Sequence, residues 1–230
     1  MRSDRRFDIA GLALLSVAIL SLLNGMVDLQ RGGHGQAAVL LGLAAFAVAA
    51  FVYRERQAAH PLMQLGLFGH AQFAFGSCVA FMYGAALFGS TYLLPVFMQI
   101  ALGLPASQAG GALLPADIML WLTTALAGRL GNRFALHQVV AFGLTLLALS
   151  FVLMIWVGTG TALWVITLWA AIGRIGLGVI LPSLNLGAMR GLPSTLIPQA
   201  SSSINFMRQL GGAVGISLAG IFLEWRLHVH

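Results

Sequence analysis

Three ionisable side chains stand inside long apolar segments of this 230-residue chain: Asp117, Arg174 and Arg208. Keeping a charge inside a membrane costs about 2.5 to 3.5 kcal/mol on insertion scales, so such a residue normally faces a charged partner or a wet cavity. A carboxylate there can take up a proton, and a neighbouring arginine favours its charged form. These three residues are therefore our candidates for substrate binding or proton coupling.

The depth of each candidate follows from the helix rise of about 1.5 Å per residue. Counted from the expected helix starts, Asp117 lies about 15 Å deep, Arg174 about 20 Å and Arg208 about 14 Å. All three fall near the middle of a hydrocarbon core about 30 Å thick. We expect Asp117 to pair with Arg174 or Arg208 and the cluster to border a central cavity. Two alternatives stay open: Arg208 extends to the lipid headgroups, and Arg174 is paired for structure alone.

The composition indicates that these residues are positioned by membrane-spanning helices. Apolar residues make up 59% of the chain and charged residues 8%, against about 25% charged in soluble domains. The mean hydropathy is +0.92. Residues 57–116 include no Asp, Glu, Lys or Arg. No soluble core accounts for this pattern, whereas a bilayer span needs about 20 mostly apolar residues.

Apolar windows predict an all-α integral membrane protein with seven transmembrane helices joined by short, glycine-containing connections. The predicted helices cover residues 9–28, 36–53, 72–99, 107–128, 136–157, 161–189 and 199–223.

Arginine placement predicts the orientation of these helices. All twelve basic residues are arginines, scattered singly or in pairs rather than clustered, which argues against nucleic-acid binding. The positive-inside rule predicts a multi-pass protein of the cell inner (plasma) membrane, with its N-terminus cytoplasmic and its C-terminus outside. Eight arginines then lie in inner segments and two, Arg31 and Arg226, in outer ones.

Residues for covalent or metal chemistry are sparse. The lone cysteine, Cys78, lies in an apolar run and provides neither a disulfide nor a cysteine metal site. Apart from His228 and His230 at the terminus, the histidines show no metal-binding spacing. We expect no metal, no cofactor and no enzymatic activity.

Several motifs, in a shared order, give the chain a family resemblance. It resembles the fourteen-helix drug:proton antiporters of the major facilitator superfamily (MFS), the EmrB/QacA-type multidrug exporters, over nearly its whole length. The motifs that carry the resemblance are Arg6-Phe7-Asp8, Arg54-Glu55-Arg56, Leu87-Phe88-Gly89-Ser90-Thr91, Gly176-Leu177-Gly178, Arg190-Gly191-Leu192-Pro193 and Asn205-Phe206-Met207-Arg208-Gln209-Leu210-Gly211-Gly212.

The resemblance implies a domain organisation and an incomplete transporter. Residues 1–66 correspond to the two central linker helices, and residues 67–230 to five helices of the C-terminal bundle, whose last helix is missing. The six-helix N-terminal bundle is also absent. Gly128, Arg129, Asn132 and Arg133 look like a degenerate copy of the family's cytoplasmic loop motif, with Asn132 where an acid is common.

The function implied by the resemblance is proton-driven export of small lipophilic or cationic compounds by alternating access, inactive in this chain alone. Its partners are then the substrate, protons, the lipid bilayer and the missing N-terminal bundle. Tyr83, Tyr92 and Asn185 are candidates for the cavity lining, with ordinary packing as the open alternative. A different class also stays open, namely a non-transporting seven-helix membrane protein or an assembly partner of a separate N-terminal half.

Overall fold

A computed structural model describes residues 8–58, 62–130 and 134–229 of the chain. Over these residues it forms helices only, and each α-helix contains a segment long and apolar enough to span a bilayer. The predicted all-α fold with seven spans is confirmed. The α-helices are α1 (Ile9–Gln30), α2 (His34–Gln57), α3 (Ala71–Ala101), α4 (Ala106–Leu130), α5 (Leu136–Met154), α6 (Leu163–Ala188) and α7 (Ile197–Val229), with the short 3₁₀ helices η1 (Leu65–Gly69) and η2 (Ser194–Leu196) before α3 and α7.

Helix boundaries agree with the predicted windows within two residues except at the ends of α2, α5 and α7. The second helix was predicted to stop at residue 53 but continues to Gln57. The fifth helix was predicted to reach residue 157 but ends at Met154, because the N–H groups of Ile155 and Trp156 bond three residues back and tighten the chain into a turn. The seventh was predicted to stop at residue 223 but continues to Val229. A window predicted from hydropathy ends at the first charged residues, whereas the hydrogen-bonded helix can continue past them.

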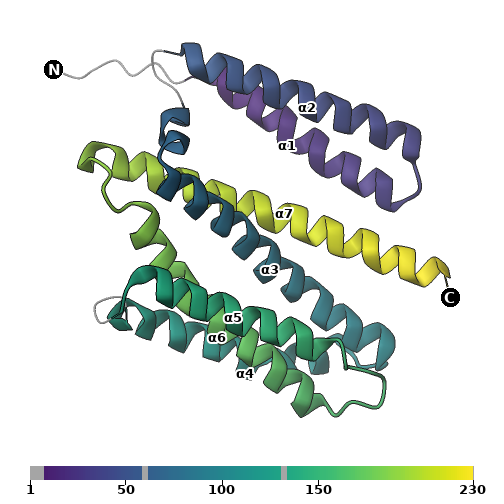
Figure 1. Ribbon diagram of the computed structural model, residues 1–230. Helices are drawn as coiled ribbons and strands as arrows, with labels where there is room; N and C mark the ends of the chain where they lie inside the picture. The colour runs from purple at the N-terminus through teal and green to yellow at the C-terminus, as the bar shows by residue number, and fades with distance from the viewer. Residues whose placement is uncertain (1–7, 59–61, 131–133, 230) are drawn as a thin grey trace.

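Two of the turns between helices depend on glycine in the left-handed region. Gly32 follows α1 with φ +76°, and Gly103 follows α3 with φ +67°. Residues with a side chain rarely adopt this conformation, so glycine there ends a helix at little cost. Both turns reverse the chain within a few residues and place consecutive helices antiparallel (Figure 1).

The helices form three groups, visible from top to bottom in Figure 1. The α1–α2 hairpin lies on one side, α3 and α7 pair in the middle, and α4, α5 and α6 form the third group, with α4 and α5 each packed on α6. Contacts between α1 and α7 and between α3 and α6 join the groups. The start of α1 and the end of α7 lie at opposite ends of the bundle (Figure 1).

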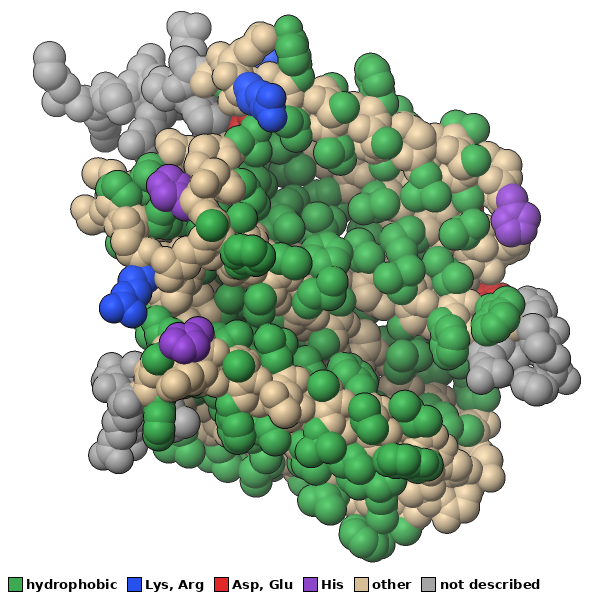
Figure 2. Space-filling view, viewed as in Figure 1, with side chains coloured by type: hydrophobic (Ala, Val, Ile, Leu, Met, Phe, Trp, Pro, Cys, Tyr) green, Lys and Arg blue, Asp and Glu red, His purple; other side chains and the backbone are tan. Residues whose placement is uncertain are grey.

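The outer surface has the character of a lipid-facing surface. Hydrophobic side chains cover most of the face in Figure 2, while the arginines and histidines visible there lie toward the two ends of the helices. Large apolar residues such as Phe46, Phe75 and Trp121 are more than 70% exposed. In water such a surface would drive aggregation, so it requires a bilayer.

Charged side chains stabilise the base of the α1–α2 hairpin. Asp8 accepts a hydrogen bond from the N–H of Gly11 and pairs with Arg54 at 2.8 Å. These contacts hold the pKa of Asp8 below its usual value, with the Arg54 hydrogen bond as the larger cause. The buried carboxylate of Glu55 accepts the N–H groups of Leu62 and Met63. Glu55 thus fixes the segment leading from α2 to η1.

The predicted boundary between residues 66 and 67 lies inside η1. Leu67 of η1 is buried in a core cluster with residues of α3, α6 and α7. The division into linker helices and C-terminal bundle stays a prediction.

Candidate functional site

Arg174 is a buried cation at the meeting point of three helices. Its side chain, on α6, is 5% exposed, and its Nε lies 2.9 Å from Oδ1 of Asp117 on α4. Its Nη2 donates to the hydroxyl of Thr91 on α3 at 2.9 Å. The side chain of Asp117 is 46% exposed. The arginine of this ion pair is therefore enclosed, whereas the aspartate is accessible.

Glycine spacing on α6 brings Arg174 against Asp117. Arg174 and Gly178 share a helix face, as do Asp117 and Leu120 on α4, because residues three or four apart are neighbours on a helix. A side chain at Gly178 would lie 2.8 Å from the carbonyl oxygen of Leu120. Only glycine lets the two helices approach so closely, and the approach places the guanidinium beside the carboxylate.

A second glycine, Gly173, lets α5 pack close to Arg174. A Cβ at Gly173 would lie 2.7 Å from Oγ of Ser150, on α5. Ser150 itself donates to the carbonyl of Trp169 at 2.7 Å. The segment Gly173–Gly178 therefore meets α5 on one face and α4 on another, which accounts for the burial of Arg174 between them.

The Thr91 contact connects two of the three helix groups. Thr91 accepts from Arg174 and donates to the carbonyl of Leu87, so its hydroxyl is satisfied on both sides. It belongs to the α3–α7 pair, whereas Arg174 and Asp117 belong to the α4–α5–α6 group. A change in the charge of Asp117 would therefore act on the junction between the groups.

Arg208 does not join this cluster. Its Nη2 donates to Oδ1 of Asn205, one turn earlier on α7, at 2.6 Å. The three charged residues therefore do not form one site. Asp117 pairs with Arg174, whereas Arg208 lies beside another cavity. The reason is helix packing, because α4 packs on α6 and α7 packs on α3.

The cavity-lining candidates have different surroundings. Asn185 lines the same cavity as Arg208. Tyr83 is 2% exposed and packs in the core. Tyr92 is half-buried on α3, directly after Thr91. Their roles stay predictions.

The predicted loop motif lies mostly beyond the described part of the chain. Gly128 belongs to the last turns of α4, and Arg129 continues the helix backbone. Asn132 and Arg133 lie outside the described residues.

Residues that sequence reasoning missed lie beside the predicted ones. Thr91 and Asn205 both belong to motifs recognised in the sequence, yet neither was assigned a contact. A polar side chain in an apolar helix, at the depth of an intramembrane charge, is the signal that identifies such a residue. For Thr91 the depth was calculable, but the face of α3 that it occupies was not.

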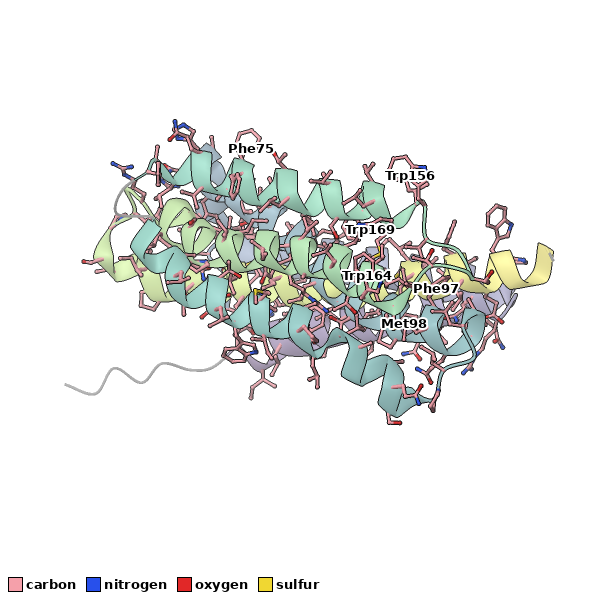
Figure 3. The ribbon with its side chains drawn as sticks, turned by 90° about the horizontal axis from the view of Figure 1, so that it is seen from below. Phe75, Phe97, Met98, Trp156, Trp164 and Trp169 are labelled. Atoms are coloured by element: carbon pink, nitrogen blue, oxygen red, sulfur yellow. The ribbon has the colours of Figure 1, made fainter. Side chains whose placement is uncertain are left out.

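Two exposed tryptophans lie at one end of the bundle. Trp156 and Trp164 are 70% and 69% exposed and flank the turn between α5 and α6. In Figure 3, Trp156 and Phe75 both point away from the bundle, with Trp156 nearer the α5–α6 turn. Tryptophan at such positions is typical of the membrane interface.

Comparison with known proteins gives relatives along the chain. No known family model matches the sequence. The multidrug transporter protein MdtP of Bacillus subtilis is 28% identical over 226 residues, which is 96% of this chain and 41% of MdtP. A methylenomycin A resistance protein of Streptomyces coelicolor is 28% identical over 95% of this chain and 46% of its own length. The tetracenomycin C resistance and export protein of Streptomyces glaucescens is 25% identical over 98% of this chain and 42% of its own length.

The chain therefore spans less than half the length of the curated relatives it matches. Another relative, from Bacillus subtilis, is the uncharacterized MFS-type transporter YhcA, which is 26% identical over 93% of this chain. The order of the motifs, the seven apolar helices and these matches agree with one another. Over almost its whole length, this multi-pass membrane chain is a homologue of MFS-type multidrug and antibiotic resistance transporters.

Proposed function

We propose that the chain forms the C-terminal part of a proton-coupled MFS exporter of lipophilic or cationic compounds. In this proposal α1 and α2 are linker helices, and α3 to α7 belong to a bundle that rocks against a second, N-terminal bundle. The names and lengths of the relatives support it, since they include multidrug and antibiotic resistance transporters more than twice as long as the matched region. In this proposal the chain exports only together with the N-terminal bundle, because alternating access needs both bundles.

The observation that carries the coupling proposal is the half-open ion pair of Asp117 and Arg174. The open face of Asp117 can receive a proton or the cationic group of a substrate, while Arg174 is enclosed. Protonation of Asp117 leaves a buried cation without its counter-charge, which is unfavourable in a low-dielectric site. Arg174 contacts Thr91 at the junction between the two helix groups. Loss of its counter-charge therefore destabilises this arrangement and favours a different packing of the groups.

The proposed orientation places the N-terminus in the cytoplasm and the C-terminus of this chain outside. The termini of the described helices lie at opposite ends of the bundle, as an odd number of spans requires (Figure 1). The surplus of arginines in the segments of the N-terminal end supports this direction. A cysteine placed in the α1–α2 turn should then react with an impermeant maleimide from outside.

Ethidium accumulation tests the export proposal. The complete coding locus that contains this chain is expressed in a drug-hypersensitive bacterium, and the 230-residue chain alone is expressed in parallel. We expect the complete product to lower ethidium accumulation until the proton gradient is collapsed, and the chain alone to have no effect. Asp117→Asn should abolish the reduction, and Arg190→Gln, which changes an exposed arginine after α6, should preserve it.

Equal accumulation in cells with the complete product and with an empty vector would exclude the export of this probe and favour the non-transporting alternative. Export that persists without a proton gradient would exclude proton coupling while leaving efflux intact. Membrane insertion is checked in each case by fractionation, so that a loss of protein is not taken for a loss of activity.

A further inference from the structure

Helices α3, α6 and α7 line an open cavity of about 350 Å³ that is separate from the Arg174 site. Its lining combines polar residues with apolar ones. The polar residues include Asn185, Ser201, Asn205 and Arg208, and the apolar residues include Leu181 and Ile204. This is the composition of a small-molecule site, in which a few polar groups orient an otherwise apolar ligand.

Arg208 has a neutral partner where Arg174 has a charged one. The ion pairs among the described residues are Arg54–Asp8 and Arg174–Asp117, and neither includes Arg208. One guanidinium nitrogen donates to Asn205. A guanidinium carries five N–H donors and no acceptor, so donors remain for a ligand. A cation at this depth requires a counter-charge or water.

Close packing fixes the helix that presents this cation. A Cβ at Gly84 on α3 would overlap the carbonyl oxygen of Arg208 and lie 3.0 Å from the backbone nitrogen of Gly212. The backbone of α3 thus touches the backbone of α7 at Arg208 itself. Asn205 lies one turn away on the same face and holds the guanidinium by its Oδ1. The backbone that carries Arg208 is therefore held against α3, beside the cavity.

We infer that this cavity binds the carboxylate of a small lipophilic acid. A guanidinium matches a carboxylate in a bidentate, charge-assisted arrangement, and the apolar lining residues would contact the body of the ligand. A cationic ligand would meet a like charge there. That the bound acid is also an exported substrate rests on the proposed function. The inference then adds acidic compounds to the proposed lipophilic and cationic substrates. Binding itself is independent of transport.

Three probes of one shape test the inference: 2-naphthoate, 2-naphthamide and 2-naphthylmethylammonium. Their dissociation constants are measured by titration calorimetry on the 230-residue chain in phosphatidylcholine nanodiscs. We expect naphthoate to bind about 10- to 100-fold more tightly than naphthamide, as one charge-assisted contact provides. The ammonium compound should bind more weakly than either at this site.

Variants assign the preference to Arg208. Arg208→Gln should reduce the naphthoate and naphthamide affinities to the same value, and Arg208→Lys, which keeps the charge and loses the fork, should give an intermediate ratio. Arg190→Gln, the control, should leave the ratio unchanged. Equal affinities in the wild type, or a ratio that survives in Arg208→Gln, would overturn the inference. If Arg208→Gln does not fold, the comparison of the wild type with Arg208→Lys decides.

The anionic group could also come from a lipid headgroup. The wild-type titration is therefore repeated in nanodiscs that contain phosphatidylglycerol. An unchanged naphthoate affinity supports a small-molecule site, whereas competitive loss assigns the cavity to lipid and overturns the inference. Ethidium export and naphthoate binding test the two proposals separately. Arg208-dependent binding without export would contradict the proposed function but support the site. Export with naphthoate binding that does not depend on Arg208 would contradict the site alone.

Discussion

The asymmetric exposure of Asp117 and Arg174 predicts that the two halves of their ion pair differ in their effect on stability. Asp117→Asn keeps the shape of the side chain but leaves Arg174, 5% exposed, without a counter-charge. Arg174→Gln leaves Asp117, whose side chain is 46% exposed and can be hydrated. We therefore expect the aspartate substitution to destabilise the protein more than the arginine substitution.

The magnitude follows from the geometry. Two unit charges about 4 Å apart at an effective dielectric constant of about 20 attract by about 4 kcal/mol. The open face of Asp117 allows screening, which reduces the interaction to about 2 kcal/mol. Stranding a buried charge costs about 3 to 5 kcal/mol when the pair is fully enclosed. With the same discount, Asp117→Asn should cost about 2 to 3 kcal/mol and Arg174→Gln about 1 kcal/mol.

The assay is a double-mutant cycle in mixed micelles. Unfolding of the wild type, both single variants and the double variant is followed by circular dichroism as the proportion of denaturing detergent rises. The coupling free energy should be about 2 kcal/mol. Thr91→Val, which removes the contact to Arg174 and the hydrogen bond to the Leu87 carbonyl without changing a charge, serves as a control and should cost about 1 kcal/mol.

Two results would refute this reasoning. A coupling free energy below about 0.5 kcal/mol would mean that the pair contributes no more than a solvent-exposed one. An Arg174→Gln variant at least as unstable as Asp117→Asn would mean that burial of the cation is not the source of the cost. Either result would also remove the physical basis for coupling through Asp117.

Two further predictions concern packing and pH. Gly84→Ala should destabilise the α3–α7 pair by about 1 to 3 kcal/mol in the same detergent unfolding assay, because the new Cβ would overlap the Arg208 carbonyl. Gly111→Ala, which has open space around it, is the control and should be neutral or slightly stabilising. The lowered pKa of Asp8 means that its pairing with Arg54 contributes stability above the usual value of 3.8, and that this contribution is lost as the pH falls through the lower folded-state pKa. The stability difference between the wild type and Asp8→Asn should therefore be constant at neutral pH and vanish in acid; a difference that persists at pH 2 would contradict the assignment.

Much of the fold was predictable because the bilayer sets a single length scale. A span needs about 20 apolar residues, so runs such as those of α1 and α2 were located within a few residues from hydropathy alone. Glycine with polar neighbours identified the turns, because few other residues reverse a chain so tightly. The depth of Asp117, Arg174 and Arg208 followed from the helix rise.

The pairing of these charges was decided by the tertiary structure. From the sequence, Asp117 had two arginines at its depth and no means of choosing between them. Depth is a distance along the helix axis, which the residue count determines, whereas a contact also depends on the direction each side chain faces and on which helices are neighbours. Gly178 brings α6 against α4, and Gly84 brings α3 against α7. Arg174 therefore meets Asp117, and Arg208 is left facing a separate cavity with a neutral partner.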